Sequence, residues 1–412
     1  MEREKYNYLI VGAGVAAAYA IEGIRDMDEN GSILMIGNEE YFPYNRPPLS
    51  KKLWFGEKKV DDIFVYKEDF YIDNNVDILL GTQVKEIDSA LRTVITDRGH
   101  SFDYDKLLLS TGGTPRRLEI PGADLEGICY YRYLDDYLKT RAKATAGKTA
   151  VVIGGGFIGS ELAASLTKNG VQVTMIFPED HIAQRVFPRS LALAIENLYL
   201  ERNTLIFKGD VPVSFEKLNG GRYLTKTRNG KQFESDIVIV GAGIKPETEL
   251  ARLAGLEVGN GIIVNENLQT SNPFIYAAGD NAFFPYQALG ANMRVEHWDN
   301  AIAQGRHAGW NMAGNNQAYD YMPFFFSDIF DFAYSAVGEV NAELSTFSDW
   351  EEEYKRGVIY YLQDYKVKGV MMVNIHGKID DARRMIREGR EMIPLESLCG
   401  AIRSDSAGAK AA

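Results

Sequence analysis

Short apolar runs, glycine-rich turns and longer amphipathic stretches alternate along the first part of the chain. In "YNYLIVGAGVAAAYAIEGIRDMDENGSILMIGNEE" (residues 6–40), an apolar strand leads into a turn, an alanine-rich helix follows, and a second strand covers residues 32–36. This order predicts a β-α-β unit. In its turn Gly12 permits a sharp bend, Gly14 lets the backbone approach a pyrophosphate, and the small Ala17 lets the helix pack closely.

The same pattern returns in "KTAVVIGGGFIGSELAASLTKNGVQVTMIFPED" (residues 148–180), with Gly154, Gly156 and Gly159 at the turn. An acidic residue follows the second strand of each unit, Glu39 in the first and Glu179 in the second. A carboxylate at that place can accept hydrogen bonds from ribose hydroxyls. Two dinucleotide folds in one chain suggest two dinucleotides meeting at one interface, which favours hydride transfer between a flavin and a nicotinamide.

A third glycine-containing segment, "NPFIYAAGDNAFF" (residues 272–284), reads as an apolar strand that ends at Asp280. We expect a helix directly after it. Asp280 can bond a ribityl hydroxyl of a flavin while backbone N–H groups face a phosphate. The alternative is that Asp280 is simply the N-cap of that helix.

Composition and charge narrow the classes of function. The chain has 412 residues, enough for two or three domains, and a formal net charge of −12, which argues against non-specific nucleic-acid binding. No apolar run reaches the length of a membrane span, and no targeting peptide is visible, so we expect a cytoplasmic protein. Cys129 and Cys399 are the two cysteines, and no CxxC motif exists, which excludes a closely spaced redox dithiol.

Four motifs, in order, carry a resemblance: "PYNRPPLSKKLW" (43–54), "GGGFIGSELA" (154–163), "YAAGD" (276–280) and "RVEHWDNA" (294–301). They resemble the FAD-dependent pyridine nucleotide oxidoreductases, most closely the branch of apoptosis-inducing factor and the oxygenase-type ferredoxin reductases. The resemblance implies an α/β fold with two Rossmann-like domains, for FAD and NAD, plus a C-terminal α+β domain with an antiparallel sheet. The expected boundaries are 1–115 (FAD, first part), 116–244 (NAD), 245–320 (FAD, second part) and 321–412 (C-terminal).

The proline-rich loop is the most distinctive of these motifs, and the family places its Arg46 and Lys51 over the FAD. Arg46 can pair with phosphate, and Lys51 is a point charge that can stabilise a reduced flavin. The resemblance also implies that Glu161 pairs with Lys51, since a buried carboxylate needs a partner. Phe157 resembles the aromatic residue that covers the flavin. The alternatives are that Arg46 and Lys51 are solvated cations of the loop and that Phe157 only packs in the core.

Further ligand contacts follow from the family alone. Glu296, His297 and Trp298 would contact the flavin and the nicotinamide, with His297 in a binding role only, because hydride transfer needs no proton relay. Phe326 stands where close relatives usually carry tryptophan, so stacking is retained but an indole N–H bond is not; a core aromatic is the alternative. The remaining expected cofactor contacts are Val84, Thr111, Gly112 and Gly243, and no metal site is expected.

The expected activity is hydride transfer from NADH to flavin N5, followed by electron delivery to an unidentified acceptor: a ferredoxin, a quinone or a small molecule such as monodehydroascorbate. The loop "GNEEYFPYNRPP" (37–48) lacks the cysteine of the thiol-dependent relatives. The alternative is a slow redox sensor, like apoptosis-inducing factor, whose NADH-reduced state controls dimerisation or partner binding; a homodimer is left open. The position of Glu179 predicts that the protein prefers NADH to NADPH, because a carboxylate there would repel a 2′-phosphate.

Two expectations concern the C-terminal region. Arg383, Arg387 and Arg390 fall at i, i+4 and i+7 of a helix over 378–392, with Lys378 and Arg384 nearby. Such a basic face suits an acidic electron-transfer partner, although a merely solvated face is the alternative. The tail "SDSAGAKAA" is expected to be disordered.

Overall fold

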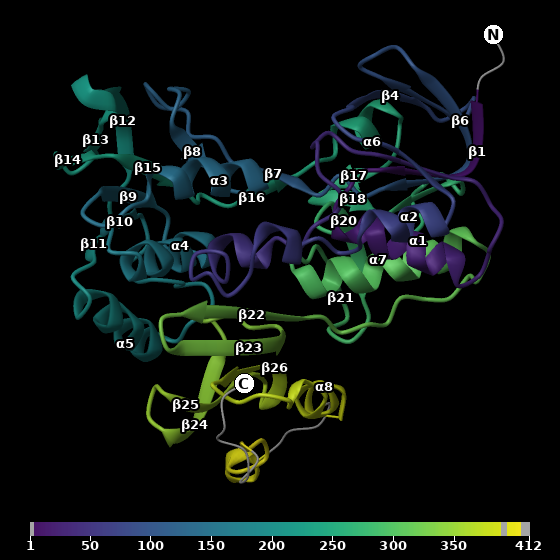
Figure 1. Cartoon of the computed structure of the whole chain (residues 1–412). Coiled ribbons are helices and arrows are strands. Elements are labelled where there is room, and N and C mark those ends of the chain that lie inside the picture. Colours follow the sequence, from purple (N-terminus) through teal and green to yellow (C-terminus); the bar gives the residue numbers. More distant parts are fainter. Residues whose placement is uncertain (1–3, 389–393, 405–412) are drawn as a thin grey trace. The chain divides into compact units, whose positions relative to one another are not determined.

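The computed structural model describes residues 4–388 and 394–404 (Figure 1), which form two compact units. The first unit contains residues 4–46, 59–114 and 244–323. The second contains residues 47–58, 115–243 and the described residues from 324 onward. The chain therefore passes between the units several times, and the short segment 47–58 groups with the second unit although it lies within the first third of the sequence. The domain boundaries expected from the sequence remain predictions.

The first unit is built on a mixed sheet with the order β3-β2-β1-β6-β5-β4, in which β19 also pairs with β6. Strand β1 runs parallel to β2 and β6, while β4 and β5 add an antiparallel edge. The buried strands read as continuous apolar runs, as expected for parallel strands covered on both faces. The strands are β1 (Glu4–Val11), β2 (Ile33–Ile36), β3 (Val76–Leu79), β4 (Val84–Asp88), β5 (Thr93–Thr96), β6 (Ser101–Leu109) and β19 (Ile275–Ala277).

Helices α1 (Val15–Arg25) and α7 (Trp298–Met312) pack very closely in the first unit. A Cβ atom added at Gly305 would lie 2.3 Å from the carbonyl oxygen of Ala16, and one at Gly309 would lie 2.3 Å from that of Ala20. Only glycine permits this approach of the two backbones. The unit also contains η2 (Val60–Asp62), α2 (Glu68–Asp73), α6 (Glu249–Leu253), and the paired strands β7 (Gly113–Pro115) and β16 (Ile244–Pro246).

The prediction of a helix directly after Asp280 is wrong. The chain continues instead into strand β20 (Ala282–Tyr286), part of a four-stranded sheet with the order β17-β18-β20-β21. The segment "AFFPY" is rich in aromatic residues and contains Pro285, which favour an extended strand over a helix interior. Asp280 is therefore not a helix N-cap. The other strands of this sheet are β17 (Val258–Gly259), β18 (Gly261–Ile263) and β21 (Ala291–Met293).

The second unit contains a parallel sheet with the order β11-β10-β9-β15-β8. A three-stranded antiparallel sheet, β12-β13-β14, supplies Phe215 and Tyr223 to the same apolar core as Val151 and Ile176. The elements are η1 (Pro47–Ser50), β8 (Ile128–Tyr130), α3 (Leu134–Lys143), β9 (Thr149–Ile153), α4 (Phe157–Lys168), β10 (Gln172–Phe177), α5 (Arg189–Leu200), β11 (Leu205–Lys208), β12 (Pro212–Lys217), η3 (Asn219–Gly221), β13 (Tyr223–Thr227), β14 (Gln232–Ser235) and β15 (Ile237–Val240).

The C-terminal part of the second unit is a five-stranded antiparallel sheet with the order β22-β23-β26-β25-β24. Together with the mixed sheet of the first unit and the parallel sheet of the second, it confirms the predicted fold class. Among the described residues, no helix combines the length and the apolar character that crossing a membrane requires. The elements are β22 (Phe324–Ile329), β23 (Phe332–Gly338), β24 (Ser345–Glu352), β25 (Arg356–Gln363), β26 (Lys366–Val373), α8 (Ile379–Glu388) and η4 (Leu395–Leu398).

Candidate functional site

The glycine turn of the first unit has the geometry of a phosphate cradle. Gly12 has φ +111°, and a Cβ there would lie 2.3 Å from the carbonyl oxygen of Ser110, so only glycine fits. Gly14 precedes α1 and faces open space: none of the described atoms lies within 4 Å of where its Cβ would be. No side chain among the described residues caps this end of α1, so its backbone N–H groups suit a pyrophosphate. Ala17 is fully buried behind the turn.

The second unit repeats this arrangement at α4. Gly154 has φ +115°, Gly156 opens onto space clear of described atoms to 4 Å, and a Cβ at Gly159 would lie 2.1 Å from the carbonyl oxygen of Gly154. Within the described part of the chain α4 also lacks a side-chain N-cap. Both turns therefore fit the pyrophosphate of a dinucleotide, one in each unit.

The proline-rich loop is anchored by its aromatic end. The backbone after Pro47 forms the short helix η1, which suits consecutive prolines. Trp54 is buried and its indole N–H donates to the carbonyl of Leu49 at 2.7 Å, while the Tyr131 hydroxyl donates to the same carbonyl at 2.5 Å. The bond from Tyr131 ties the loop to the segment that precedes α3, and the side chain of Lys51 is directed inward.

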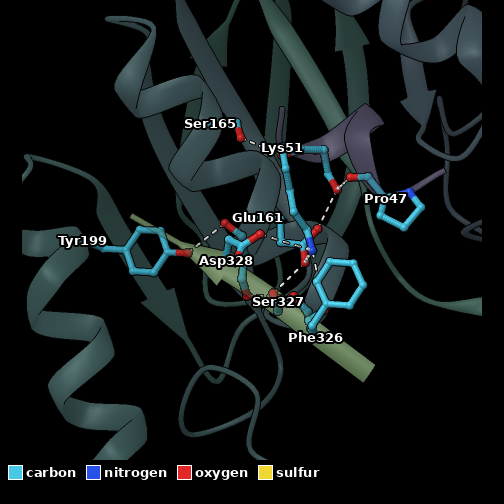
Figure 2. Close-up of polar contacts among 11 residues, drawn as sticks. Pro47, Lys51, Glu161, Ser165, Tyr199, Phe326, Ser327 and Asp328 are labelled. Carbon is cyan, nitrogen blue, oxygen red and sulfur yellow. Dashed lines mark hydrogen bonds and ion pairs between the residues drawn. The ribbon is translucent and has the colours of Figure 1, made fainter. Parts of the chain in front are cut away.

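Lys51 and Glu161 form a buried ion pair, 2.9 Å between Nζ and Oε1, with side chains 7% and 5% exposed (Figure 2). The pairing that the family resemblance implied is confirmed. Glu161 lies one turn into α4. It also accepts hydrogen bonds from two buried hydroxyls: Ser50 donates to Oε2 and Ser327 to Oε1, each at 2.5 Å. Three donors therefore satisfy this buried carboxylate.

Residues of β22 complete the surroundings of the ammonium group. Lys51 Nζ lies 4.4 Å from the ring centroid of Phe326 and 3.5 Å from its carbonyl oxygen, and 4.0 Å from a carboxylate oxygen of Asp328. On α4, Ser165 stands one turn after Glu161 and donates to the carbonyl of Ser50 at 2.6 Å. Figure 2 shows these side chains converging from η1, α4 and β22. The result is a positive charge held in one place by three segments distant in sequence.

In the first unit, Glu39 and Arg46 bind each other. The guanidinium of Arg46 lies 2.8 Å from Glu39, whose other oxygen accepts the Tyr44 hydroxyl at 2.6 Å. Arg46 Nη1 also donates to the Tyr44 hydroxyl at 3.0 Å. The sequence assigned Glu39 to a ribose and Arg46 to a phosphate without connecting them. The structure shows one cluster in which each residue orients the other.

The "RVEHW" segment lies at the start of α7. Arg294 donates to Glu296 and, at 3.0 Å, to the carbonyl of Asp280, while the Trp298 indole donates to Asn45 at 2.7 Å. His297 is half-buried, and burial lowers the pKa of its imidazole to about 4. The ring is therefore neutral at pH 7, and its binding role remains a prediction.

The remaining expected contacts are placed as follows. Phe157, the first residue of α4, is 37% exposed and packs edge-on against Phe325 at 5.6 Å. Glu179 is half-buried just after β10. In the first unit, the Thr111 hydroxyl accepts from the Asn281 amide at 3.0 Å, and the Oδ1 atom of Asn281 is buried with no partner among the described residues. Gly112 and Gly243 have positive φ after their strands, and Val84 is buried at the start of β4.

The structure also bears on the predicted basic face of the C-terminal helix and on the two cysteines. On α8, Arg383 pairs with Asp380 at 3.0 Å, and Arg384 pairs with Asp381, so acidic neighbours offset part of the predicted basic face. Arg390 and most of the predicted tail lie outside the described residues. Both cysteines of the chain are described and are free thiols, and burial raises the pKa of Cys129 to about 12.

The sequence analysis did not identify several residues that hydrogen-bond to the expected site residues. Ser50 and Ser327 donate to Glu161, Trp298 donates to Asn45, and Arg46 donates to Tyr44. Ser50, Asn45 and Tyr44 all belong to the proline-rich motif, whose hydrogen-bonding side chains were a usable signal. Ser327 lies in "FFFSD", where a lone serine within an aromatic run gives the only hint of a buried polar partner.

Comparison with known proteins bears directly on these features. The pyridine nucleotide-disulphide oxidoreductase family matches residues 6–305, and the C-terminal domain of mitochondrion-associated apoptosis-inducing factor matches residues 348–388. Apoptosis-inducing factor 1 of Dictyostelium discoideum is 33% identical, over 98% of this chain and 82% of that protein. Peroxisomal monodehydroascorbate reductase 4 of Arabidopsis thaliana is 34% identical, over 88% of this chain and 78% of that protein.

A solved structure agrees with the family matches and with the two similar sequences. Putidaredoxin reductase, crystallised in a covalent complex with putidaredoxin, superposes with a TM-score of 0.88 at 31% identity, covering 95% of this chain and 98% of that one. The two dinucleotide turns and the family match give the same result. This chain belongs to the pyridine nucleotide-disulphide oxidoreductase family and is an oxidoreductase that uses FAD and NAD as cofactors.

Proposed function

We propose that this protein oxidises NADH and passes the electrons through FAD to a small ferredoxin-type protein, without a redox-active disulfide. The observation that carries the proposal is the buried Lys51–Glu161 pair, together with the absence of cysteine from the loop 37–48 that precedes Lys51. The whole-chain similarity to putidaredoxin reductase, which was crystallised in a covalent complex with putidaredoxin, supports a small redox protein as the acceptor. The similarity to monodehydroascorbate reductases makes a small organic radical the next acceptor to test.

In this proposal the two glycine turns bind the two pyrophosphates, and the FAD-binding region comprises residues 1–115 and 245–320, with NAD bound by residues 116–244. FAD, when bound, accepts two electrons from NADH as a hydride and releases them to the acceptor. Lys51 supplies a fixed positive charge that favours the reduced cofactor. Glu161, Ser50 and Ser327 hold that charge in position, so no reorganisation is needed during the reaction.

Other proposed roles concern binding. Glu39 would hold the FAD ribose while it orients Arg46, and Asp280 with Glu296, His297 and Trp298 would contact the flavin. Phe157 and Phe326 are the aromatic groups proposed to stack on the reacting rings. Glu179 would bind both hydroxyls of the NADH ribose. A cytoplasmic location remains a prediction.

An acceptor screen coupled to NADH oxidation tests the proposal. The purified protein should be yellow and should bleach with NADH in the absence of oxygen. We expect rapid turnover with a [2Fe–2S] ferredoxin, slower turnover with monodehydroascorbate, and little with disulfide substrates. A protein that binds no FAD, or that reduces disulfides fastest, would contradict the proposal.

A second candidate is a slow redox sensor. Its support is the match of residues 348–388 to the C-terminal domain of apoptosis-inducing factor and the 33% identity to that protein from Dictyostelium. Here NADH would change the oligomeric state more than it drives catalysis. Molar mass by light scattering with and without NADH, measured beside the steady-state rate, separates the two candidates. Fast turnover with an unchanged mass favours the enzyme.

A further inference from the structure

The loop that carries Glu179, residues 178–188, is hydrogen-bonded to its surroundings at defined points. Ala183 has φ +48°, in the left-handed region, and its N–H donates to the carbonyl of Gly155 at 2.9 Å. That bond ties the loop to the glycine turn that would hold the pyrophosphate. The neighbouring N–H of Ile182 donates at 3.0 Å to Oε1 of Glu196, a residue of α5. These two hydrogen bonds hold the strained backbone at Ala183 in place.

The second oxygen of Glu196 binds a cation. Lys208 Nζ lies 2.8 Å from Oε2, and the side chains are 7% exposed for Glu196 and 37% for Lys208. Lys208 is the last residue of β11 and stands in register with Phe177, the last residue of β10. The next residue, Gly209, donates its N–H to the carbonyl of Glu179 at 3.2 Å. Lys208 therefore lies beside the expected ribose position at the carboxyl edge of the sheet, where such folds bind their ligands.

We propose that Glu196 is a positioning residue that sets the preference for NADH over NADPH. One oxygen holds the loop that presents Glu179, and the other neutralises Lys208, a cation beside the expected ribose position that can attract a 2′-phosphate. NADPH carries that dianion and NADH does not, so pairing Lys208 with a buried carboxylate acts against NADPH alone. This inference rests on the proposed function, because it deepens the role of the NAD-binding region.

Glu196→Gln separates the two effects. The amide oxygen can still accept the Ile182 N–H, while the negative charge of residue 196 that neutralises Lys208 is lost. We expect kcat/KM for NADPH to rise about fivefold, with that for NADH within about twofold of the wild type. The dissociation constant of NADP⁺, measured by calorimetry, should fall by a similar factor while that of NAD⁺ stays constant. Glu201→Gln, an exposed position just beyond the same helix, is the matched control and should change neither.

Changes at Lys208 test the electrostatic reason independently. Adding Lys208→Met to Glu196→Gln should return kcat/KM for NADPH to about the wild-type value, because the cation is then gone. Lys208→Met alone should lower it about threefold, since Glu196 then adds uncompensated negative charge. This single variant also keeps the test valid if Glu196→Gln does not fold.

The outcomes separate the two levels of inference. A wild-type protein that does not oxidise NADH overturns the proposed function. If NADH is oxidised but Glu196→Gln and Lys208→Met both leave the NADPH-to-NADH ratio within twofold of the wild type, the role of Glu196 is overturned alone. A gain with NADPH that persists in the double variant likewise overturns it, because Lys208 would not be the cause.

Discussion

The Lys51–Glu161 pair allows a quantitative test, because both side chains are almost fully buried, at 7% and 5% exposed. Removing one member of a buried ion pair leaves an unpaired charge and costs about 3–5 kcal/mol. Glu161 keeps its bonds from Ser50 and Ser327 when Lys51 is replaced, so the low end of that range applies. We expect Lys51→Met and Glu161→Gln each to lower the free energy of unfolding by about 3 kcal/mol.

The double variant should also lose only about 3 kcal/mol rather than 6, a coupling energy of about 3 kcal/mol, since no charge is left unpaired. Equilibrium urea unfolding of the four proteins measures this directly, and stopped-flow reduction by NADH provides a second, kinetic cycle. The exposed pair Arg222–Glu234, with side chains 41% and 54% exposed, is the control and should couple by less than about 1 kcal/mol. Strictly additive effects of Lys51→Met and Glu161→Gln would refute the reasoning.

Three further predictions follow from single residues. The wild type should prefer NADH over NADPH at least about tenfold in kcat/KM, a difference of about 1.4 kcal/mol, and Glu179→Ala should narrow the gap mainly by raising the KM for NADH; equal use of both cofactors would contradict this. The pKa of His297, about 4 because of burial, lies below its ordinary 6.5, so as pH falls from 6.5 the unfolded chain binds the proton first. His297 should therefore lower the free energy of unfolding by about 2 kcal/mol between pH 7 and pH 5, and His297→Gln should remove that part of the slope. Burial also raises the pKa of Cys129 to about 12, so a thiol reagent at pH 8 should label Cys399 and not Cys129 in the native protein, whereas equal labelling would contradict this burial.

Local patterns were read correctly where the physical requirement is itself local. A strand, a turn with positive φ at its first glycine and a helix follow one another within about a dozen residues at both Gly12 and Gly154, so the two units could be found without knowledge of the fold. The prediction of a helix after Asp280 failed because a Gly-Asp turn can lead into either a helix or a strand. The aromatic residues that follow pack as β20 of a small sheet whose other strands lie elsewhere in the sequence.

The sequence by itself determined the two β-α-β units, because periodicity and turn chemistry are properties of neighbouring residues. Its four motifs implied the family, and through that resemblance the antiparallel C-terminal sheet. Only the tertiary structure decided which side chains share a buried charge. Ser327 and Glu161 are 166 positions apart, and Ser50 and Glu161 are 111 apart. Their meeting depends on the register of β22, where a shift of one residue would turn Ser327 away, and on the packing of η1 against α4. No local pattern encodes such a convergence, because each residue alone is satisfied equally well by water.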